Sequence, residues 1–136
     1  MLVVDPSVIA PAVADGGRDG DLCRSRLAGQ SLAAPDLLRI EVLSVIPRHA
    51  SSGQLSVSQA SNAIDDLLNL PIRVYPTAPL LRRSWEQRAN VTAYDACYIS
   101  LAEALDAMLT TSDTRLAMPS GYVAPSTSCS RCNVRW

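Results

Sequence analysis

Residues 90–113 read NVTAYDACYISLAEALDAMLTTSD, a helical pattern that runs directly into a short strand. Thr92 is a good helix N-cap, and the apolar and small residues that follow it recur at helical spacing. Asp95 therefore falls in the first helical turn, while Asp113 follows the strand predicted at 108–111. Sites in open α/β sheets lie beyond the carboxyl ends of the strands, beside helix N-termini. The two aspartates are thus predicted to meet in one crevice, although each alone also fits an ordinary place at a helix start or in a turn.

The rest of the chain continues this alternation of strands and helices. Met1–Val4 is an apolar run that predicts a buried strand, and Asp5 follows it as the cap of a helix with Pro6 at its first position. Further strands are predicted at 32–34, 72–75 and 122–124, and further helices at 19–27, from Pro35, after the cap Ser56 and from Pro79. Pro11 and Pro47 are expected to kink or end their helices. The alternation predicts an α/β fold, with a central parallel sheet covered by helices on both faces.

Length and composition set the class of protein. A chain of 136 residues, 48% of them hydrophobic, fits one domain with a sizeable core. The 12 basic and 13 acidic residues give a net charge of −1, so overall charge does not indicate attraction to nucleic acid. No segment approaches the length of a membrane span, and no basic region precedes the apolar start. A cytoplasmic location without membrane attachment is expected. The four cysteines of the chain are therefore expected to be thiols.

Four acids occupy related positions in this predicted fold. Asp5 and Asp113 follow strands, Asp95 opens a helix, and Glu41 lies beside an apolar helical stripe, where an acid is costly unless it is paired or bound to metal. Converging carboxylates repel one another unless cations neutralise them. Oxygen ligands, with no histidine near these acids in the sequence, favour Mg²⁺ or Mn²⁺ over zinc. A carboxylate-held pair of such ions is well suited to hydrolysing phosphodiester bonds.

Taken together, four ordered segments resemble the PIN-domain ribonucleases of the VapC toxin type. They are VVDPSV at 3–8, LLRIEVLSV at 37–45, VTAYDACYISLAEAL at 91–105 and LTTSDTRLA at 109–117. The resemblance implies a PIN-like three-layer nuclease domain at 1–125, followed by a C-terminal tail at 126–136. It also implies a metal-dependent endoribonuclease that acts as the toxin of a type II toxin–antitoxin module. RNA as substrate, a homodimer and inhibition by a cognate VapB-type antitoxin are implied with it.

By motif position, the resemblance assigns metal binding and catalysis to Asp5, Glu41, Asp95 and Asp113. Ser7 and Thr111 match positions whose hydroxyl groups orient carboxylates or bound water, and for both an ordinary place at a helix start or in a strand is an alternative. Arg115 is a candidate contact to RNA phosphate, with a salt bridge to a nearby acid as its alternative.

Two other classes of function stay open. A catalytically silent PIN-like module could share this fold and act only by binding or interaction. A nucleotide-binding α/β protein is disfavoured, because no Gly-rich phosphate loop follows a strand. Cys129 and Cys132 form a CxxC pair, but neither the other cysteines nor His49 supply a recognisable zinc-ligand spacing.

Apolar stripes and arginines on the surface of the predicted helices are candidate interaction surfaces. Apolar stripes at 37–45 and 57–68 are candidate dimer surfaces, although Pro47 falls where the first of these helices usually continues in the family. Arg82, Arg83 and Arg88 are interpreted as a solvated helix face rather than as an RNA-binding patch.

Overall fold

The computed structural model describes residues 1–51 and 55–112 of the chain. Its elements are β1 (Leu2–Val4), α1 (Pro6–Ala14), α2 (Arg18–Leu27), β2 (Leu32–Pro35), α3 (Leu38–Ser51), α4 (Val57–Asn69), β3 (Ile72–Tyr75), the short 3₁₀ helix η1 (Ala78–Leu80), α5 (Leu81–Glu86), α6 (Ala93–Ala104) and β4 (Met108–Thr110). The predicted strand at 122–124 and the tail lie outside the described residues.

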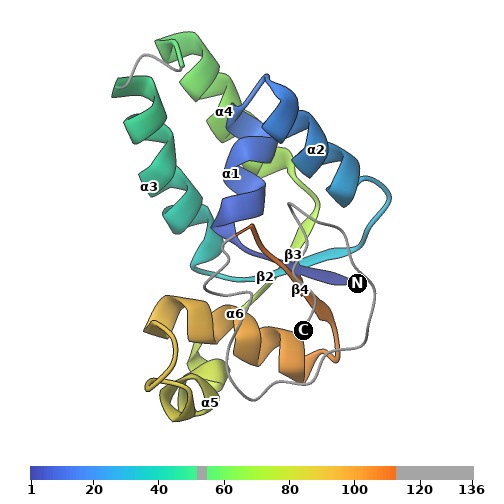
Figure 1. The fold of residues 1–136 in the computed structure, drawn as a ribbon, viewed down its shortest axis with the longest axis vertical. Coiled ribbons are helices and arrows are strands. Elements are labelled where there is room, and N and C mark those ends of the chain that lie inside the picture. The colour runs from blue at the N-terminus through green and yellow to red at the C-terminus, as the bar shows by residue number, and fades with distance from the viewer. Residues whose placement is uncertain (52–54, 113–136) are drawn as a thin grey trace.

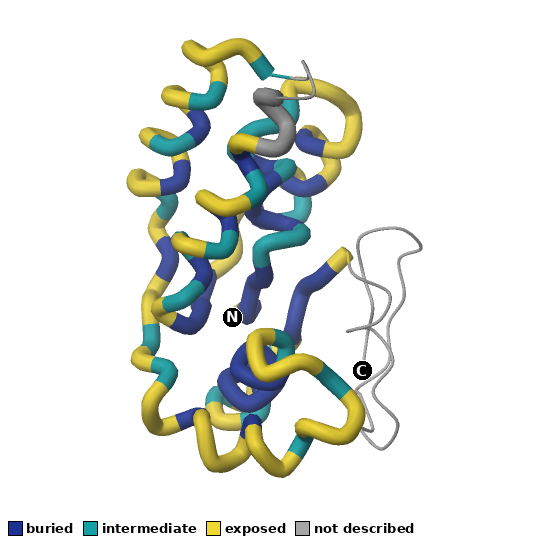
Figure 2. The backbone as a smooth tube through the Cα atoms, turned by 90° about the vertical axis from the view of Figure 1, so that its left-hand side faces the viewer, coloured by how far each residue is buried: buried dark blue, intermediate teal, exposed yellow. Residues whose placement is uncertain are grey.

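The four described strands form one parallel sheet in the order β3-β2-β1-β4. Leu2 of β1 pairs with Leu32 of β2 on one side and with Met108 of β4 on the other. Figures 1 and 2 show α1 to α4 on one side of this sheet and α5 and α6 on the other, so the predicted α/β class and its three layers are confirmed. Because β1 and β4 are parallel neighbours, the residues that follow them, Asp5 and Thr111, leave the sheet at the same edge.

Helix α6 is buried almost all round. Its buried residues are Ala96, Cys97, Tyr98, Ile99, Ser100, Leu101 and Ala102, the dark stretch in the lower part of Figure 2. The helix packs against β1, β2 and β4 and against α5. A helix that is apolar on every side is typical of one covered on every side. This location holds the first turn of α6 in a fixed relation to the sheet.

The predicted helix caps are present. The Asp5 side chain caps α1 and accepts a hydrogen bond from the Ser7 amide, with Pro6 at the start of the helix. Thr92 caps α6 by accepting from the Asp95 amide. Ser56 caps α4 by accepting from the Gln59 amide, and its own amide donates to the Gln59 side chain. Each cap satisfies an amide that would otherwise lack a partner at a helix start.

Neither Pro11 nor Pro47 ends its helix, so that part of the expectation is wrong. α1 continues through Pro11 to Ala14, and α3 continues through Pro47 to Ser51. A helical proline deprives the carbonyl four residues earlier of its amide donor. For Pro11 that carbonyl belongs to Ser7, and it accepts a bond of 2.9 Å from the Ser112 hydroxyl instead.

For Pro47 the corresponding residue is Leu43, which is 41% exposed and therefore lies on the solvent side of α3. The start of α3 also differs from the prediction. Pro35 belongs to β2, and α3 begins only at Leu38, because Pro35 pairs with Tyr75 in the sheet.

Two further expectations concern the cysteines and membrane-spanning helices. Cys23 and Cys97 are buried and form no disulfide, while the CxxC pair lies outside the described residues. Within 1–51 and 55–112, no helix is both long and apolar enough to cross a membrane.

Candidate metal centre

Asp5 is a buried carboxylate at the end of β1. Only 3% of the residue is exposed. Its Oδ1 atom accepts hydrogen bonds from the Ser7 amide at 3.0 Å and from the Ser7 hydroxyl at 2.6 Å. Burial raises the pKa of Asp5, while hydrogen bonds from Ser7 and Thr111 act in the opposite direction. The ionised form is therefore costly in this location, and a cation would relieve that cost.

Glu41 reaches the same region from the first turn of α3. It is half-buried, and its Oε2 atom accepts a hydrogen bond of 2.5 Å from the Tyr98 hydroxyl on α6. Burial raises the pKa of Glu41, the Tyr98 hydrogen bond lowers it, and the negative charges of Asp95 and Asp5 raise it further. The negative charges of two other acids, Asp5 after β1 and Asp95 on α6, thus reach Glu41.

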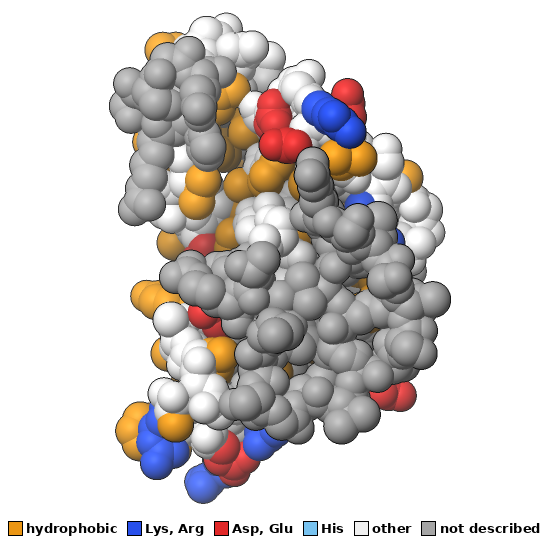
Figure 3. Space-filling model, viewed as in Figure 1, with side chains coloured by type: hydrophobic (Ala, Val, Ile, Leu, Met, Phe, Trp, Pro, Cys, Tyr) orange, Lys and Arg blue, Asp and Glu red, His pale blue; other side chains and the backbone are white. Residues whose placement is uncertain are grey.

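Asp95, in the first turn of α6, is the third predicted site acid that the structure describes. It is half-buried, and its amide donates to the Thr92 hydroxyl at 3.2 Å, so this turn is fixed by the helix cap. Acidic side chains are visible between α3 and α6 at the left margin of Figure 3. The fourth predicted acid, Asp113, and the candidate RNA contact Arg115 lie outside the described residues.

Ser7 links Asp5 to the end of β4. Its hydroxyl lies 3.2 Å from the Thr111 hydroxyl and accepts a hydrogen bond of 2.8 Å from the Ser112 amide. The structure therefore brings Ser7 and Thr111, both selected from the sequence, to the buried Asp5 carboxylate. Their functional role stays a prediction.

The donor set fits a hard divalent cation. The described side chains that interact here are carboxylates and hydroxyls, which are oxygen ligands of the kind that Mg²⁺ and Mn²⁺ prefer. Within the described part of the chain, however, no three His, Cys, Asp or Glu side chains are gathered closely enough to hold an ion by themselves.

Tyr98 is a polar residue of this region that the sequence analysis missed. It lies three residues after Asp95 on α6, so the two side chains share one face of the helix. That spacing was the available signal, because a residue one turn from a site acid is a candidate neighbour of the site. Burial and the Glu41 carboxylate raise the pKa of Tyr98, so its hydroxyl stays protonated and serves as a donor.

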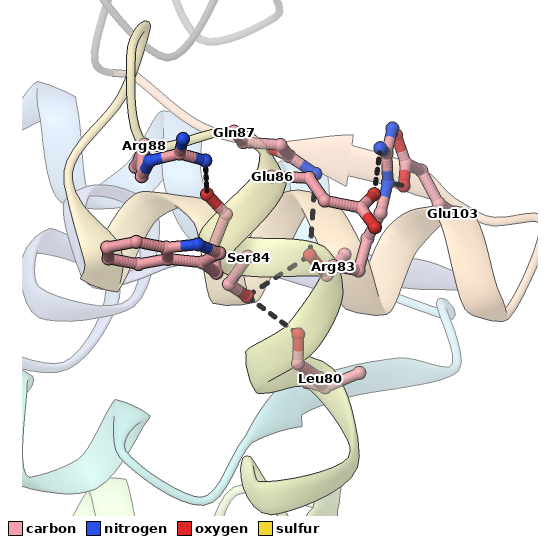
Figure 4. A network of polar contacts seen from close by, with 9 residues as sticks. Leu80, Arg83, Ser84, Glu86, Gln87, Arg88 and Glu103 are labelled. Carbon is pink, nitrogen blue, oxygen red and sulfur yellow. Dashed lines mark hydrogen bonds and ion pairs between the residues drawn. The ribbon is translucent and has the colours of Figure 1, made fainter.

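Arg83 and Arg88 of the α5 region have partners close to them in the structure. Figure 4 shows Arg83 facing Glu86 and Glu103, with its Nε 2.7 Å from Glu103 Oε2. The guanidinium of Arg88 lies over the Trp85 ring, 4.5 Å from its centroid. Arg83 is paired and about half exposed, and such surface ion pairs contribute only about 0–1 kcal/mol. These contacts agree with a solvated helix face.

Comparison with known proteins places this geometry in context. The family description "PIN domain" matches residues 2–120. Ribonuclease VapC1 of Mycobacterium tuberculosis is 40% identical over 120 residues, which cover 88% of this chain and 90% of that protein. Ribonuclease VapC9 of the same organism is 37% identical over 117 residues, covering 86% and 89% of the two chains.

Two solved structures share the fold. The crystal structure of VapC20 from Mycobacterium tuberculosis, described as a Sarcin-Ricin loop cleaving toxin, matches with a TM-score of 0.62 at 16% identity, covering 79% of this chain and 85% of that chain. The crystal structure of PAE2754 from Pyrobaculum aerophilum matches with a TM-score of 0.63 at 23% identity, covering 85% of this chain and 76% of the other. At these identities the likeness concerns the fold.

Proposed function

Because this chain belongs to the PIN domain family, we propose that it is a metal-dependent endoribonuclease that acts as the toxin of a type II toxin–antitoxin module. Its VapC relatives are named ribonucleases, and the alignment covers nearly the whole of each of them. The observation that carries the proposal is the position of Glu41 on α3, where the negative charges of both Asp5 and Asp95 reach it from other elements.

In the proposed mechanism, Asp5, Glu41 and Asp95 bind the cation together with Asp113. A bound Mg²⁺ or Mn²⁺ lowers the pKa of an attacking water and stabilises charge on the leaving oxygen. Asp5 is held for this task by two hydrogen bonds from Ser7, and Thr111 steadies the same group from the end of β4. Arg115 is proposed to contact RNA phosphate.

The proposed partners follow from the same family. We infer an RNA substrate, a VapB-type antitoxin and a homodimer in the cytoplasm. The apolar stripes of α3 and α4 support an interface, because Ile40 is 69% exposed, Val57 is 88% exposed and Leu68 is 61% exposed. A catalytically silent interaction module remains the second candidate, since it would use the same exposed stripes.

Cleavage of RNA by the purified protein tests the proposal. We expect cleavage with Mg²⁺ or Mn²⁺ and none in excess EDTA, because the proposed mechanism needs a bound ion to lower the pKa of the attacking water. Sequencing the 5′ ends of cellular RNA after expression would identify the cut positions. Cleavage that persists in EDTA contradicts the metal mechanism, and a metal-loaded protein that cuts no cellular RNA favours the silent module.

Ser7→Ala provides a graded test of how Asp5 is held. The variant removes a donor to Asp5 and the acceptor of the Ser112 amide. We expect cleavage to fall about tenfold or more, and the free energy of unfolding to fall by about 0.5–1.5 kcal/mol because a partly buried hydrogen bond to Asp5 is lost. Cleavage rates and urea unfolding measure the two effects. Ser58→Ala, on the exposed start of α4, is the control. Normal cleavage by Ser7→Ala would show that Ser7 serves α1 alone.

A further inference from the structure

The hydroxyl of Tyr98 joins two elements that carry site acids. Tyr98 belongs to α6, as Asp95 does, and donates to Glu41 of α3, which lies 57 residues earlier in the chain. The phenol is 1% exposed and belongs to the apolar core. Only its hydroxyl therefore meets a charged group, at a donor–acceptor distance of 2.5 Å that is typical of a charge-assisted bond.

This geometry suits the positioning of a carboxylate. Packing in the core fixes the ring of Tyr98, so its single O–H donor has a fixed place. Glu41 is half-buried on a side chain with several rotatable bonds, and its orientation would otherwise vary. With one bond accepted at Oε2, the carboxylate keeps Oε1 and further lone pairs as ligands.

We propose that Tyr98 is a positioning residue of the cation site, whose hydroxyl holds Glu41 in the orientation in which it shares an ion with Asp5 and Asp95. The inference rests on the proposed function, because it assigns a task within the same site. It differs from a merely structural role, in which the bond would only tether α3 to α6 and would not affect affinity for a cation.

Tyr98→Phe tests the inference, because it removes one oxygen and keeps the ring in the core. We expect the Kd for Mn²⁺, measured by isothermal titration calorimetry, to rise about tenfold or more. RNA cleavage should fall at low Mg²⁺ and recover at saturating Mg²⁺, since the ligands themselves remain. Tyr94→Phe is the matched control, because Tyr94 lies one turn earlier on α6 and is 62% exposed. Unchanged Mn²⁺ affinity in Tyr98→Phe would overturn the inference, even if the variant melts at a lower temperature.

A double variant shows whether Tyr98 acts through Glu41. Glu41→Gln should weaken Mn²⁺ binding by itself, and adding Tyr98→Phe should then cost little more, because the two residues form one unit. Losses that simply multiply would mean that Tyr98 acts by another route and would also overturn the inference.

The unaltered protein offers a readout that does not depend on the folding of a variant. With ¹³Cζ-labelled tyrosine, the resonance of Tyr98 should shift on addition of Mg²⁺, while that of Tyr94 stays in place. An unmoved Tyr98 signal in protein that binds Mg²⁺ would refute the positioning role alone. A natural protein that neither binds Mn²⁺ nor cleaves RNA would instead refute the proposed function, and this inference with it.

Discussion

Asp5→Asn is expected to abolish metal-dependent RNA cleavage, with a fall in rate of more than about 100-fold. Mutation of a residue that only supports a metal ligand typically lowers activity about 10–100-fold, and loss of a ligand itself should lower it further. An amide keeps the shape of the carboxylate and removes its charge, so the cation loses an anionic ligand. Asp95→Asn should likewise abolish metal-dependent RNA cleavage. Cleavage rates at fixed Mg²⁺, and relief of any growth arrest on expression, are the measurements.

The same substitution should leave the fold intact or make it slightly more stable without metal. Asparagine caps a helix about as well as aspartate, so α1 keeps its N-cap. The cost of ionising a carboxylate that is 3% exposed disappears. Asp65→Asn, on the exposed face of α4, is the control that should change neither property. If Asp5 were only a helix cap, Asp5→Asn would cleave RNA like the natural sequence.

Divalent cations are expected to stabilise the protein strongly near neutral pH. At a Mg²⁺ concentration of about 100 times the Kd, binding to the folded state contributes about 2.7 kcal/mol, or a rise in melting temperature of roughly 5–15 °C for a chain of this size. Thermal melting with Mg²⁺ and with EDTA measures the effect. Asp5→Asn should lose most of it, and an equal rise in that variant would place the ion elsewhere.

The pH dependence of this effect has a definite sign. The pKa values of Asp5 and Glu41 are raised by folding above their ordinary values of 3.8 and 4.5. The folded state thus holds these protons more tightly, and the associated stability is present below the ordinary values and lost as pH rises through the raised ones. Without metal, the melting temperature of Asp5→Asn minus that of the natural sequence should therefore increase from pH 4 to pH 7. A constant difference over that range would contradict a raised pKa at Asp5.

Local patterns in the sequence are sufficient for most of the fold. The helix caps at Asp5, Ser56 and Thr92 depend on neighbouring residues only, and the structure places all three as predicted. The alternation of apolar strands and helices indicates a parallel sheet, which the structure confirms. The same rule brings Asp5 and Thr111 to one edge, because the ends of parallel strands share an edge.

Contacts between distant residues account for what the sequence did not predict. Local rules predict a kink or an end of the helix at Pro11. The helix continues, and the Ser112 hydroxyl donates to the carbonyl that Pro11 leaves without an amide donor. Tyr98 reads as an ordinary core residue of α6, and its bond to Glu41 depends on how α3 and α6 meet across the sheet edge. The packing angle of two helices is a tertiary property, so a spacing rule alone can suggest this pair but cannot establish it.

Pro11 affects how the end of the described chain is attached to the first helix. By itself it weakens α1, because proline inside a helix costs about 3 kcal/mol relative to alanine. Yet the acceptor that it leaves open is where Ser112, near the other end of the described chain, is attached. Any other residue at position 11 would bring an amide as a second donor to the Ser7 carbonyl, in competition with the Ser112 hydroxyl. The carbonyl that Pro11 leaves without an amide donor thus binds Ser112, which follows the last described strand, to the first helix.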